Sequence, residues 1–278
     1  MTIEQIINQA LIEDIGDGDH TSLATIPHDK NGKARLLVKQ DGILCGMGIA
    51  KKVFQMTDST LQFSQNLSDG MQIHMGDIAF TIEGKAISIL SAERLVLNFM
   101  QRMSGIATFT YQVVNQLQGL NTKVLDTRKT TPNLRVLEKY AVKTGGGENH
   151  RFGLYDMIMI KDNHVDFAGG IENAIAATRE YLLKKGKNLK IEIEARNIVE
   201  VQKIMHTGGV HRIMFDNFTP EAMKEAVLLI NGKYETEASG GITLENIRQY
   251  AETGVDYISV GALTHQIKSL DMSLKAVK

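Results

Sequence analysis

Residues 190–195 read KIEIEA and residues 212–217 read RIMFDN, two short segments in which polar and apolar residues alternate. Alternation with a period of two is the pattern of a β-strand. Helical stretches separate these segments from four similar ones: KVLDT (123–127), DMIMIKD (156–162), ETEASGG (235–241) and YISVGA (257–262). Six strand–helix repeats predict an α/β fold, with a parallel sheet that forms an open (β/α) barrel and carries its helices outside.

The two faces of these predicted strands differ in polarity. One phase is apolar and suits contact with the outer helices: Ile158, Ile160, Ile191, Ile193, Ile213, Phe215, Ile258 and Val260. The opposite phase points inward and places polar or small residues near the carboxyl ends of the strands: Lys161, Glu194, Asp216, Ser239 and Gly261. Charges in a barrel lumen are stable only when paired or solvated at the mouth, and the mouth is where barrel active sites lie. We therefore predict a functional site there.

The first hundred residues have a different rhythm. A helix is expected near the start, followed by strands at 34–40, 60–66 and 78–90 and by a long helix over 91–119 that Ser91 caps. This order predicts an α+β sandwich domain over residues 1–105. The barrel domain is expected over residues 106–266, and residues 267–278 are expected to pack back on the first domain.

Composition excludes several classes of protein. The chain has 31 Lys and Arg against 32 Asp and Glu, so no global charge favours nucleic acid or an acidic membrane. The single cysteine, Cys45, excludes an intramolecular disulfide, and no Cys/His spacing suggests zinc. Signal-peptide and membrane-spanning patterns are missing from the sequence. We expect a cytoplasmic protein.

Positive charge is nevertheless concentrated in two segments, DTRKTTPNLR (126–135) and GGGENHR (145–151). Their cationic residues are Arg128, Lys129, Arg135, His150 and Arg151. Because the segments follow the first predicted strand or precede the second, they reach the same mouth, where two or three such groups could hold a small dicarboxylate. The alternative is a set of solvated loop charges. We interpret the three glycines as a flexible loop that lets His150 and Arg151 approach a ligand.

Two further features have two explanations each. Glu194 and Asp216, on adjacent strands, could share Mg²⁺, or Glu194 could form an ion pair with Lys161. The amides of ASGGIT (238–243) and VGALTH (260–265) could hold a phosphate at strand tips and a helix N-terminus, or the glycines could serve ordinary turns.

At these residues the chain resembles the quinolinate phosphoribosyltransferase family, the decarboxylating pyrophosphorylases of NAD synthesis. The resemblance runs through nearly the whole chain in the following motifs: ALIEDIGDGDHTS, ERLVLNFMQRMSGIAT, DTRKTTPNLR, KTGGGENHR, DMIMIKDNH, IEIEA, MFDNFTPE, EASGGIT and VGALTH. A common family form has Gly where Asn133 stands, a difference that concerns a turn.

The resemblance implies dimers whose active sites lie at the interface. It implies that the quinolinate carboxylates bind Arg128, His150, Arg151 and Lys161, with Arg102 from the partner subunit. It implies that Lys129 helps to hold phosphoribosyl pyrophosphate, that Glu194 and Asp216 contact its ribose hydroxyls and Mg²⁺, and that Ser239, Gly240 and Gly261 take its 5′-phosphate. The catalytic residues expected on this basis are Lys129, Lys161, Glu194 and Asp216.

Three other functions fit parts of the pattern. A related barrel family associated with molybdate transport operons shares the framework, although TRKTTP together with NHR argues against it. A Schiff-base aldolase would use Lys161 as its nucleophile. A non-catalytic phosphate sensor would use the glycine turns alone.

Overall fold

The computed structural model describes residues 1–277, which form two compact units. Unit 1 contains residues 1–111, 130–146 and 263–277, and unit 2 contains residues 112–129 and 147–262. The chain therefore enters unit 2 twice. The domain boundaries expected from the sequence stay a prediction.

Unit 2 contains the parallel sheet that the alternating segments predict. Its strands lie in the order β6-β11-β10-β9-β8-β7, and every neighbouring pair is parallel. The strands are β6 (Lys123–Leu125), β7 (Ile158–Ile160), β8 (Ile191–Ala195), β9 (Arg212–Asp216), β10 (Glu235–Ser239) and β11 (Tyr257–Ser259). Among the described residues β6 and β7 do not pair with each other, so the sheet is an open barrel, as expected.

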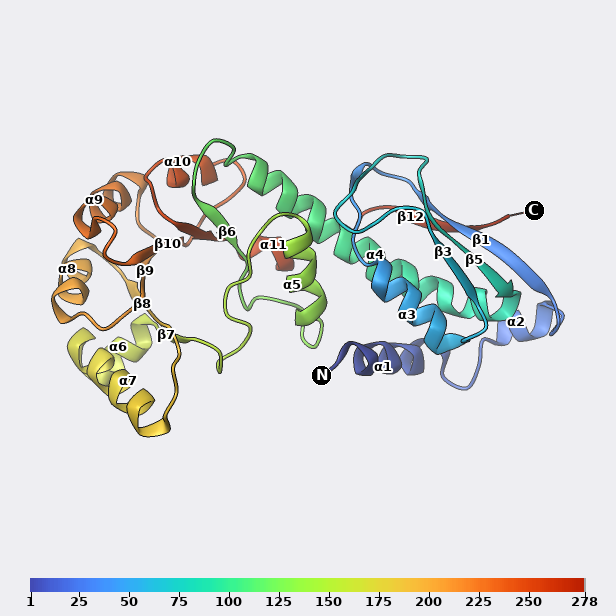
Figure 1. The fold of residues 1–278 in the computed structure, drawn as a ribbon, viewed down its shortest axis with the longest axis horizontal. Coiled ribbons are helices and arrows are strands. Elements are labelled where there is room, and N and C mark those ends of the chain that lie inside the picture. The colour runs from blue at the N-terminus through green and yellow to red at the C-terminus, as the bar shows by residue number, and fades with distance from the viewer. Residues whose placement is uncertain (278) are drawn as a thin grey trace. The chain divides into compact units, whose positions relative to one another are not determined.

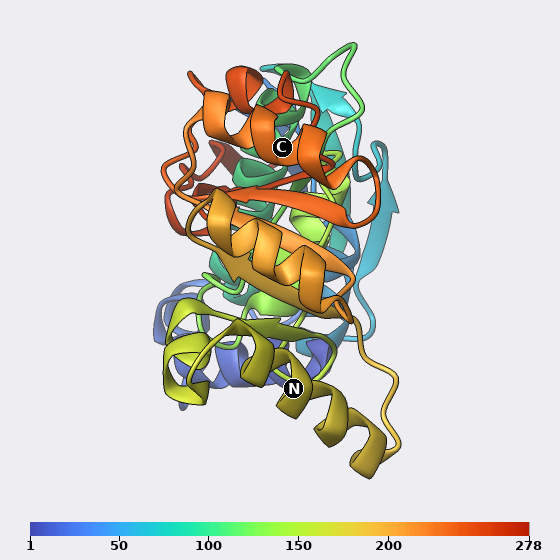
Figure 2. The same ribbon diagram turned by 90° about the vertical axis from the view of Figure 1, so that its left-hand side faces the viewer.

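Helices cover the outer face of this sheet (Figures 1 and 2). They are α6 (Asp162–Ala168), α7 (Ile171–Lys185), α8 (Ile198–Thr207), α9 (Pro220–Ile230) and α10 (Ile247–Ala251). Local signals set their starts: the Asn197 side chain accepts from Glu200 N at α8, and the Thr219 side chain caps α9, which has a proline at its first position. These caps start α8 and α9 within four residues of the ends of β8 and β9, so only short loops lie at the carboxyl ends of these two strands.

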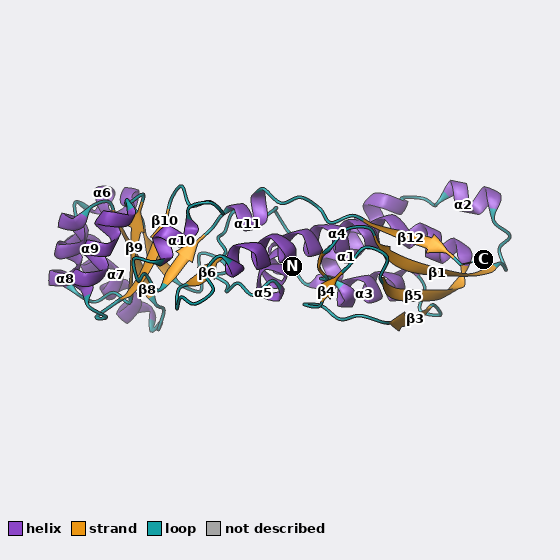
Figure 3. Ribbon diagram, turned by 90° about the horizontal axis from the view of Figure 1, so that it is seen from above, coloured by secondary structure: helices purple, strands orange, loops and turns teal. Residues whose placement is uncertain are grey.

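Unit 1 is built around an antiparallel sheet in the order β12-β1-β5-β3 (Figure 3). The strands of this sheet are β1 (Asn31–Val38), β3 (Gln62–Gln65), β5 (Ile78–Lys85) and β12 (Met272–Ala276), and β2 (Gly42–Ile43) and β4 (Gln72–Ile73) form a separate two-stranded sheet. Its helices are α1 (Ile3–Ile15), α2 (His20–Thr25), α3 (Met47–Thr57), α4 (Ala86–Asn115, whose last residues belong to unit 2), α5 (Arg135–Thr144) and α11 (Ala262–His265, which starts at the unit boundary). The rings of Phe54, Phe63 and Phe80 pack together between sheet and helix. The predicted α+β class is confirmed.

One expected strand is wrong. Residues 86–90, AISIL, alternate in polarity but form the first turns of α4. The buried residues Ile89, Ala92 and Val96 follow one another at helical spacing, so the segment continues the apolar face of the long helix. Ser91 consequently lies inside α4 and is not its cap; its hydroxyl donates to Asp19 at 3.0 Å.

The first of the three glycines is also not part of a flexible loop. Gly145 ends α5 and is buried against α4, where a Cβ atom would overlap the Ala107 carbonyl and stand 2.7 Å from the Thr110 Cβ. Glycine at this position permits the close approach of two helices.

Candidate active site

The carboxyl ends of the unit 2 strands bring together four of the predicted residues, which we call the rim: Lys161, Glu194, Asp216 and Ser239. Asp216 and Ser239 are register partners on β9 and β10. Lys161, directly after β7, places its Nζ 2.5 Å from Glu194 Oε1 on β8. These contacts between neighbouring strands agree with the prediction that the four side chains lie on the inner face of the sheet.

Glu194 is the most buried member of the rim. Its side chain is 8% exposed, whereas that of Lys161 is 46% exposed. Both carboxylate oxygens have donors, because Oε2 also accepts from the Asp162 amide at 3.3 Å. The ion pair considered in the sequence analysis is thus present.

Asp216 suits a hard cation better than Glu194 does. Its Oδ2 accepts from the uncharged Asn217 amide at 3.1 Å, so no cation of the protein competes there according to the described contacts. Mg²⁺ prefers oxygen ligands and keeps several of its waters or substrate oxygens. The residues therefore fit a metal held by substrate and Asp216, with Glu194 neutralised by Lys161.

The cationic segments contribute two guanidinium groups that are close enough to affect each other. Arg151 is half-buried, and its Nη1 donates to the Met157 carbonyl at 3.3 Å. Burial and then the charge of Arg128 lower the pKa of Arg151. Like charges at close range destabilise each other unless an anion joins them.

Arg128 and Lys129 lie in the loop after β6, and both are exposed. The Lys129 amide donates to Thr127 Oγ1 at 3.1 Å, a short contact that shapes this loop. Their exposure at the carboxyl end of β6 suits residues that bind a ligand from solvent.

Below the rim lies a buried group of charged residues, the lumen cluster: His150, Glu192, Arg212 and Glu237. His150 Nε2 is 3.0 Å from Glu192 Oε2 and 3.3 Å from Glu237 Oε2. Arg212 Nη1 donates to Glu237 at 2.8 Å. These contacts show that Glu192, Arg212 and Glu237, from three adjacent strands, lie on the same face of the sheet.

The lumen cluster is anchored from below. Arg212 also donates to Glu235 at 3.0 and 3.1 Å, and its guanidinium lies 4.0 Å from the centre of the Tyr257 ring. Glu192 and Glu237 are fully buried, and their carboxylates are stabilised by Arg212 and His150. This layer fixes the His150 ring from beneath.

Protonation in the lumen cluster follows from these contacts. Burial alone would lower the pKa of His150, but hydrogen bonds to Glu192 and Glu237 and their charges raise it to about 9. The Arg151 amide points at Nδ1 from 2.6 Å, which favours a neutral ring, but two carboxylates outweigh one amide dipole. Burial, followed by the charge of Glu237, raises the pKa of Glu192 to about 7.

The lumen cluster also contains three atoms of metal-ligand type. The atoms of His150, Glu192 and Glu237 lie within 4.8 Å of one another. The guanidinium of Arg212 already supplies positive charge there, so these residues are better explained as a charge-paired structural layer.

Of the lumen cluster, His150 is among the residues predicted from the sequence, whereas Arg212 and Glu237 are not. The signal was available, because Arg212 precedes Asp216 by four residues and Glu237 precedes Ser239 by two, so both share the inward phase.

The glycine turns differ from each other. Gly240 and Gly241 have φ values of +97° and +62°, and α10 begins only at Ile247. The amides after Ser239 therefore belong to a turn and not to a helix start, which corrects part of the expectation. Gly261, in contrast, directly precedes α11.

Arg102 lies in unit 1, on α4. It donates to Glu138 Oε1 at 2.6 and 2.8 Å and to Thr131 Oγ1 at 2.7 Å. Glu138 is buried, and its second oxygen accepts from the Thr131 amide at 3.1 Å. These contacts fix the direction of the Arg102 guanidinium, which stays partly exposed.

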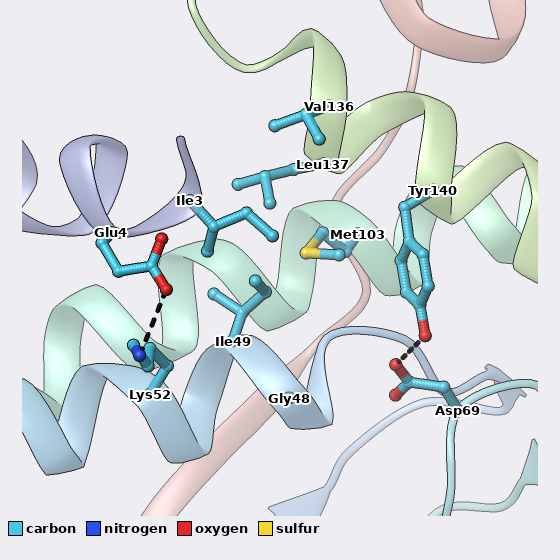
Figure 4. Close-up of a pocket in the computed structure, with 10 residues that line it drawn as sticks. All are labelled: Ile3, Glu4, Gly48, Ile49, Lys52, Asp69, Met103, Val136, Leu137 and Tyr140. Atoms are coloured by element: carbon cyan, nitrogen blue, oxygen red, sulfur yellow. Dashed lines mark hydrogen bonds and ion pairs between the residues drawn. The ribbon is translucent and has the colours of Figure 1, made fainter. Parts of the chain in front are cut away.

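Unit 1 also contains a cavity of about 480 Å³, which none of the predicted site residues lines (Figure 4). Ile49, Met103 and Leu137 form part of its apolar wall. At its edge Tyr140 donates to Asp69 at 2.8 Å, and Lys52 pairs with Glu4. Its chemistry differs from that of the rim, which is charged.

The fold and the rim define the class: an α/β-barrel protein whose strand ends carry cationic, acidic and glycine-turn groups suited to a phosphorylated, anionic substrate. Residues 106–275 match the family described as "Quinolinate phosphoribosyl transferase, C-terminal domain", and residues 19–104 match the corresponding N-terminal domain. The chain belongs to the quinolinate phosphoribosyltransferase family.

Individual relatives agree with this assignment. The chain is 45% identical over 288 residues to "Quinolinate phosphoribosyltransferase [decarboxylating] 1b" of Nicotiana tabacum, covering 98% of this chain and 82% of the relative. It is 43% identical to "Probable nicotinate-nucleotide pyrophosphorylase [carboxylating]" of Bacillus subtilis, covering 99% and 93%. The solved structure of NadC from Streptococcus pyogenes superposes with a TM-score of 0.94 at 38% identity, covering 99% and 97%.

No helix among residues 1–277 has the length and apolar character needed to cross a membrane.

Proposed function

We propose that this protein transfers the phosphoribosyl group of phosphoribosyl pyrophosphate to quinolinate, and so forms nicotinate mononucleotide, pyrophosphate and CO2 in NAD biosynthesis. The observation that carries the proposal is the gathering of charged and glycine-turn groups at the carboxyl ends of the strands, where Lys161, Glu194, Asp216 and Ser239 meet. The guanidinium groups of Arg128 and Arg151 influence each other there, and two such groups suit a doubly anionic ligand. Family membership supports the same substrate.

The cationic residues would bind quinolinate. Arg128, Arg151 and Lys161 would neutralise its two carboxylates through charge-assisted hydrogen bonds. His150, which the family resemblance also assigns to quinolinate, lies in the lumen cluster and would act from beneath through Arg151, whose amide donates to its Nδ1. Arg102 would come from the partner subunit of a homodimer, with its guanidinium held in position by Glu138.

The remaining rim residues would bind phosphoribosyl pyrophosphate. Lys129 would neutralise part of its phosphate charge, and Glu194 and Asp216 would contact the ribose. The 5′-phosphate would be taken by Ser239, Gly240 and Gly261, whose amides can donate to phosphate oxygens. Mg²⁺ held by the substrate and by Asp216, with Glu194 as the weaker protein ligand, would neutralise the charge of the departing pyrophosphate.

The chemistry then depends on where charge develops. As the bond from ribose C1 to pyrophosphate breaks, C1 becomes positive, and the carboxylates of Glu194 and Asp216 favour that change. The pyridine nitrogen of quinolinate forms the new bond to C1. The ring is then a pyridinium, whose positive nitrogen stabilises the electron pair left at C2 when CO2 departs, and C2 takes up a proton.

Lys161 is less suited to the alternative of a Schiff-base aldolase. Its Nζ is paired with Glu194 at 2.5 Å, and a paired ammonium has no free electron pair for attack on a carbonyl. Borohydride trapping with a carbonyl substrate tests this alternative, and we expect no trapped adduct.

The direct test supplies quinolinate, phosphoribosyl pyrophosphate and Mg²⁺ to the purified protein. We expect nicotinate mononucleotide and CO2 in equal amounts. Ligand binding without CO2 would favour a phosphate sensor and would refute the proposal. We further propose a cytoplasmic location, because the single cysteine suits a reducing compartment, and fractionation of the source cells tests it.

A further inference from the structure

Three asparagines of the described chain have a left-handed backbone: Asn133 with φ +67°, Asn217 with φ +55° and Asn231 with φ +47°. Residues other than glycine seldom adopt this conformation, and asparagine does so most readily. Asn231 caps the end of α9, at the opposite end of the strands from the rim. Asn217, in contrast, directly follows Asp216 at the carboxyl end of β9.

Asn217 contacts the ends of two neighbouring strands. Its backbone N–H donates to the Ser239 carbonyl on β10 at 2.9 Å. Its side-chain Nδ2 donates to Asp216 Oδ2 at 3.1 Å. In its left-handed conformation one residue makes both contacts. These two hydrogen bonds offset the energetic cost of that conformation.

The same side chain, together with the left-handed backbone of residue 240 itself, favours glycine there. A Cβ atom at Gly240 would overlap Asn217 Oδ1, would stand 2.7 Å from its Cγ and would lie 3.1 Å from its backbone nitrogen. The turn after β10 therefore packs directly on the Asn217 amide group. MFDN (214–217) and ASGG (238–241), which are separated in sequence, form one packed unit in the structure.

We propose that Asn217 is a positioning residue, which fixes the Asp216 carboxylate relative to the amides of the Ser239–Gly240 turn. The inference rests on the proposed function, in which Asp216 meets the ribose and the turn meets the 5′-phosphate. Asn217 then sets the spacing between these two parts of the phosphoribosyl pyrophosphate site. An uncharged amide suits this place, because a carboxylate would repel Asp216 and a glycine would leave Asp216 without its donor.

The first test is Asn217→Gly, which keeps the left-handed backbone accessible and removes only the side chain. We expect the KM for phosphoribosyl pyrophosphate to rise about tenfold, the size of one lost hydrogen bond to a charged group. The KM for quinolinate should change less than about twofold, since no contact to the cationic residues is removed. A merely structural role would shift both values together.

The matched control is Asn231→Gly, the same substitution in the same backbone conformation far from the rim. Both KM values should stay at the wild-type level. Equal KM values for wild type and Asn217→Gly, or parallel rises for both substrates, would overturn the inference. An inactive wild-type protein would instead refute the proposed function, so the two failures are distinguishable.

The second test uses the contact with Gly240. Gly240→Ala should lower the midpoint of thermal unfolding and raise the KM for phosphoribosyl pyrophosphate, and both effects should be smaller in the Asn217→Gly background, where Oδ1 and Cγ are gone. If Gly240→Ala alone does not fold and the double variant does, the contact between residue 240 and the Asn217 side chain is confirmed more strongly. Equal effects in both backgrounds would show that the contact does not couple the two turns. If neither Gly240→Ala nor the double variant folds, the KM values of Asn217→Gly alone decide whether Asn217 is a positioning residue.

Discussion

Three residues of the lumen cluster and three of the rim lie on the same strands of unit 2, two to four residues apart: Glu192 and Glu194 on β8, Arg212 and Asp216 on β9, and Glu237 and Ser239 on β10. Glu192 and Glu194 both point to the inner face of β8, yet Glu192 is fully buried beside His150, whereas Glu194 meets the half-exposed Lys161. In the lumen cluster the charges pair with one another out of reach of solvent. At the rim they remain within reach of solvent and therefore of a ligand. Depth along a strand, more than residue type, separates a structural charge from a functional one.

The comparison is tested most strongly at Arg212, which pairs with the buried carboxylate of Glu237 and the partly exposed carboxylate of Glu235. Arg212→Ala should lower the free energy of unfolding by about 3 kcal/mol, because the buried Glu237 loses its closest cation and keeps only the His150 ring. Denaturant unfolding measures this, with Arg196→Ala as control, because Arg196 is an exposed arginine that pairs with Glu200 and its loss should change stability much less. A loss at Arg212 as small as the control's would remove the distinction between the layers.

Loss of an exposed cation near the rim should weaken the use of substrate and leave the free energy of unfolding almost unchanged. Arg128→Ala should reduce kcat/KM for quinolinate about 100-fold, the equivalent of about 3 kcal/mol for a lost bidentate carboxylate contact. The KM for phosphoribosyl pyrophosphate should change far less. Steady-state kinetics with each substrate varied in turn gives both values, and Arg248→Ala, at another exposed arginine of unit 2, is the control. Equal losses for both substrates would contradict the assignment.

The lumen cluster should make stability depend on pH. The pKa of His150 is raised from 6.5 to about 9 in the folded protein, so its stabilising contribution is complete below pH 6.5 and is lost as the pH rises through about 9. We expect the free energy of unfolding to fall by about 2 kcal/mol over this window, and less in His150→Gln. Chemical unfolding at a series of pH values measures it. A wild-type curve as flat as that of the variant would mean that the ring is neutral.

The smallest effect concerns the two glutamates of β8. Glu194→Gln should lower kcat about tenfold, since a carboxylate beside the developing charge becomes neutral, with little change in the KM for quinolinate. Glu192→Gln should instead flatten the pH dependence of unfolding. If instead Glu192→Gln lowers kcat and Glu194→Gln flattens the pH dependence, the catalytic residues lie deeper in the barrel than we propose.

Much of this arrangement could be predicted from the sequence because a strand repeats every two residues. The six strands, the open parallel sheet and the inward phase of Glu194 and Asp216 all follow from that period. The five residues from Ala86 could not be assigned, since so short an alternating run fits a strand and a helix equally.

The contacts of Asn217 escaped prediction for a different reason. They depend on a left-handed turn and on packing against a residue 23 positions away, and neither leaves a periodic signal. The same holds for Asn133, whose backbone is also left-handed, a conformation that glycine and asparagine adopt most readily.

The pairing of β12 with β1 has a consequence for synthesis on the ribosome. Ala276 is the register partner of Ala34, so the unit 1 sheet receives this strand only after the whole of unit 2 has been translated. The barrel can begin to fold while the sheet still has an unpaired edge, which makes that edge a target for chaperones or for wrong pairing with another nascent chain.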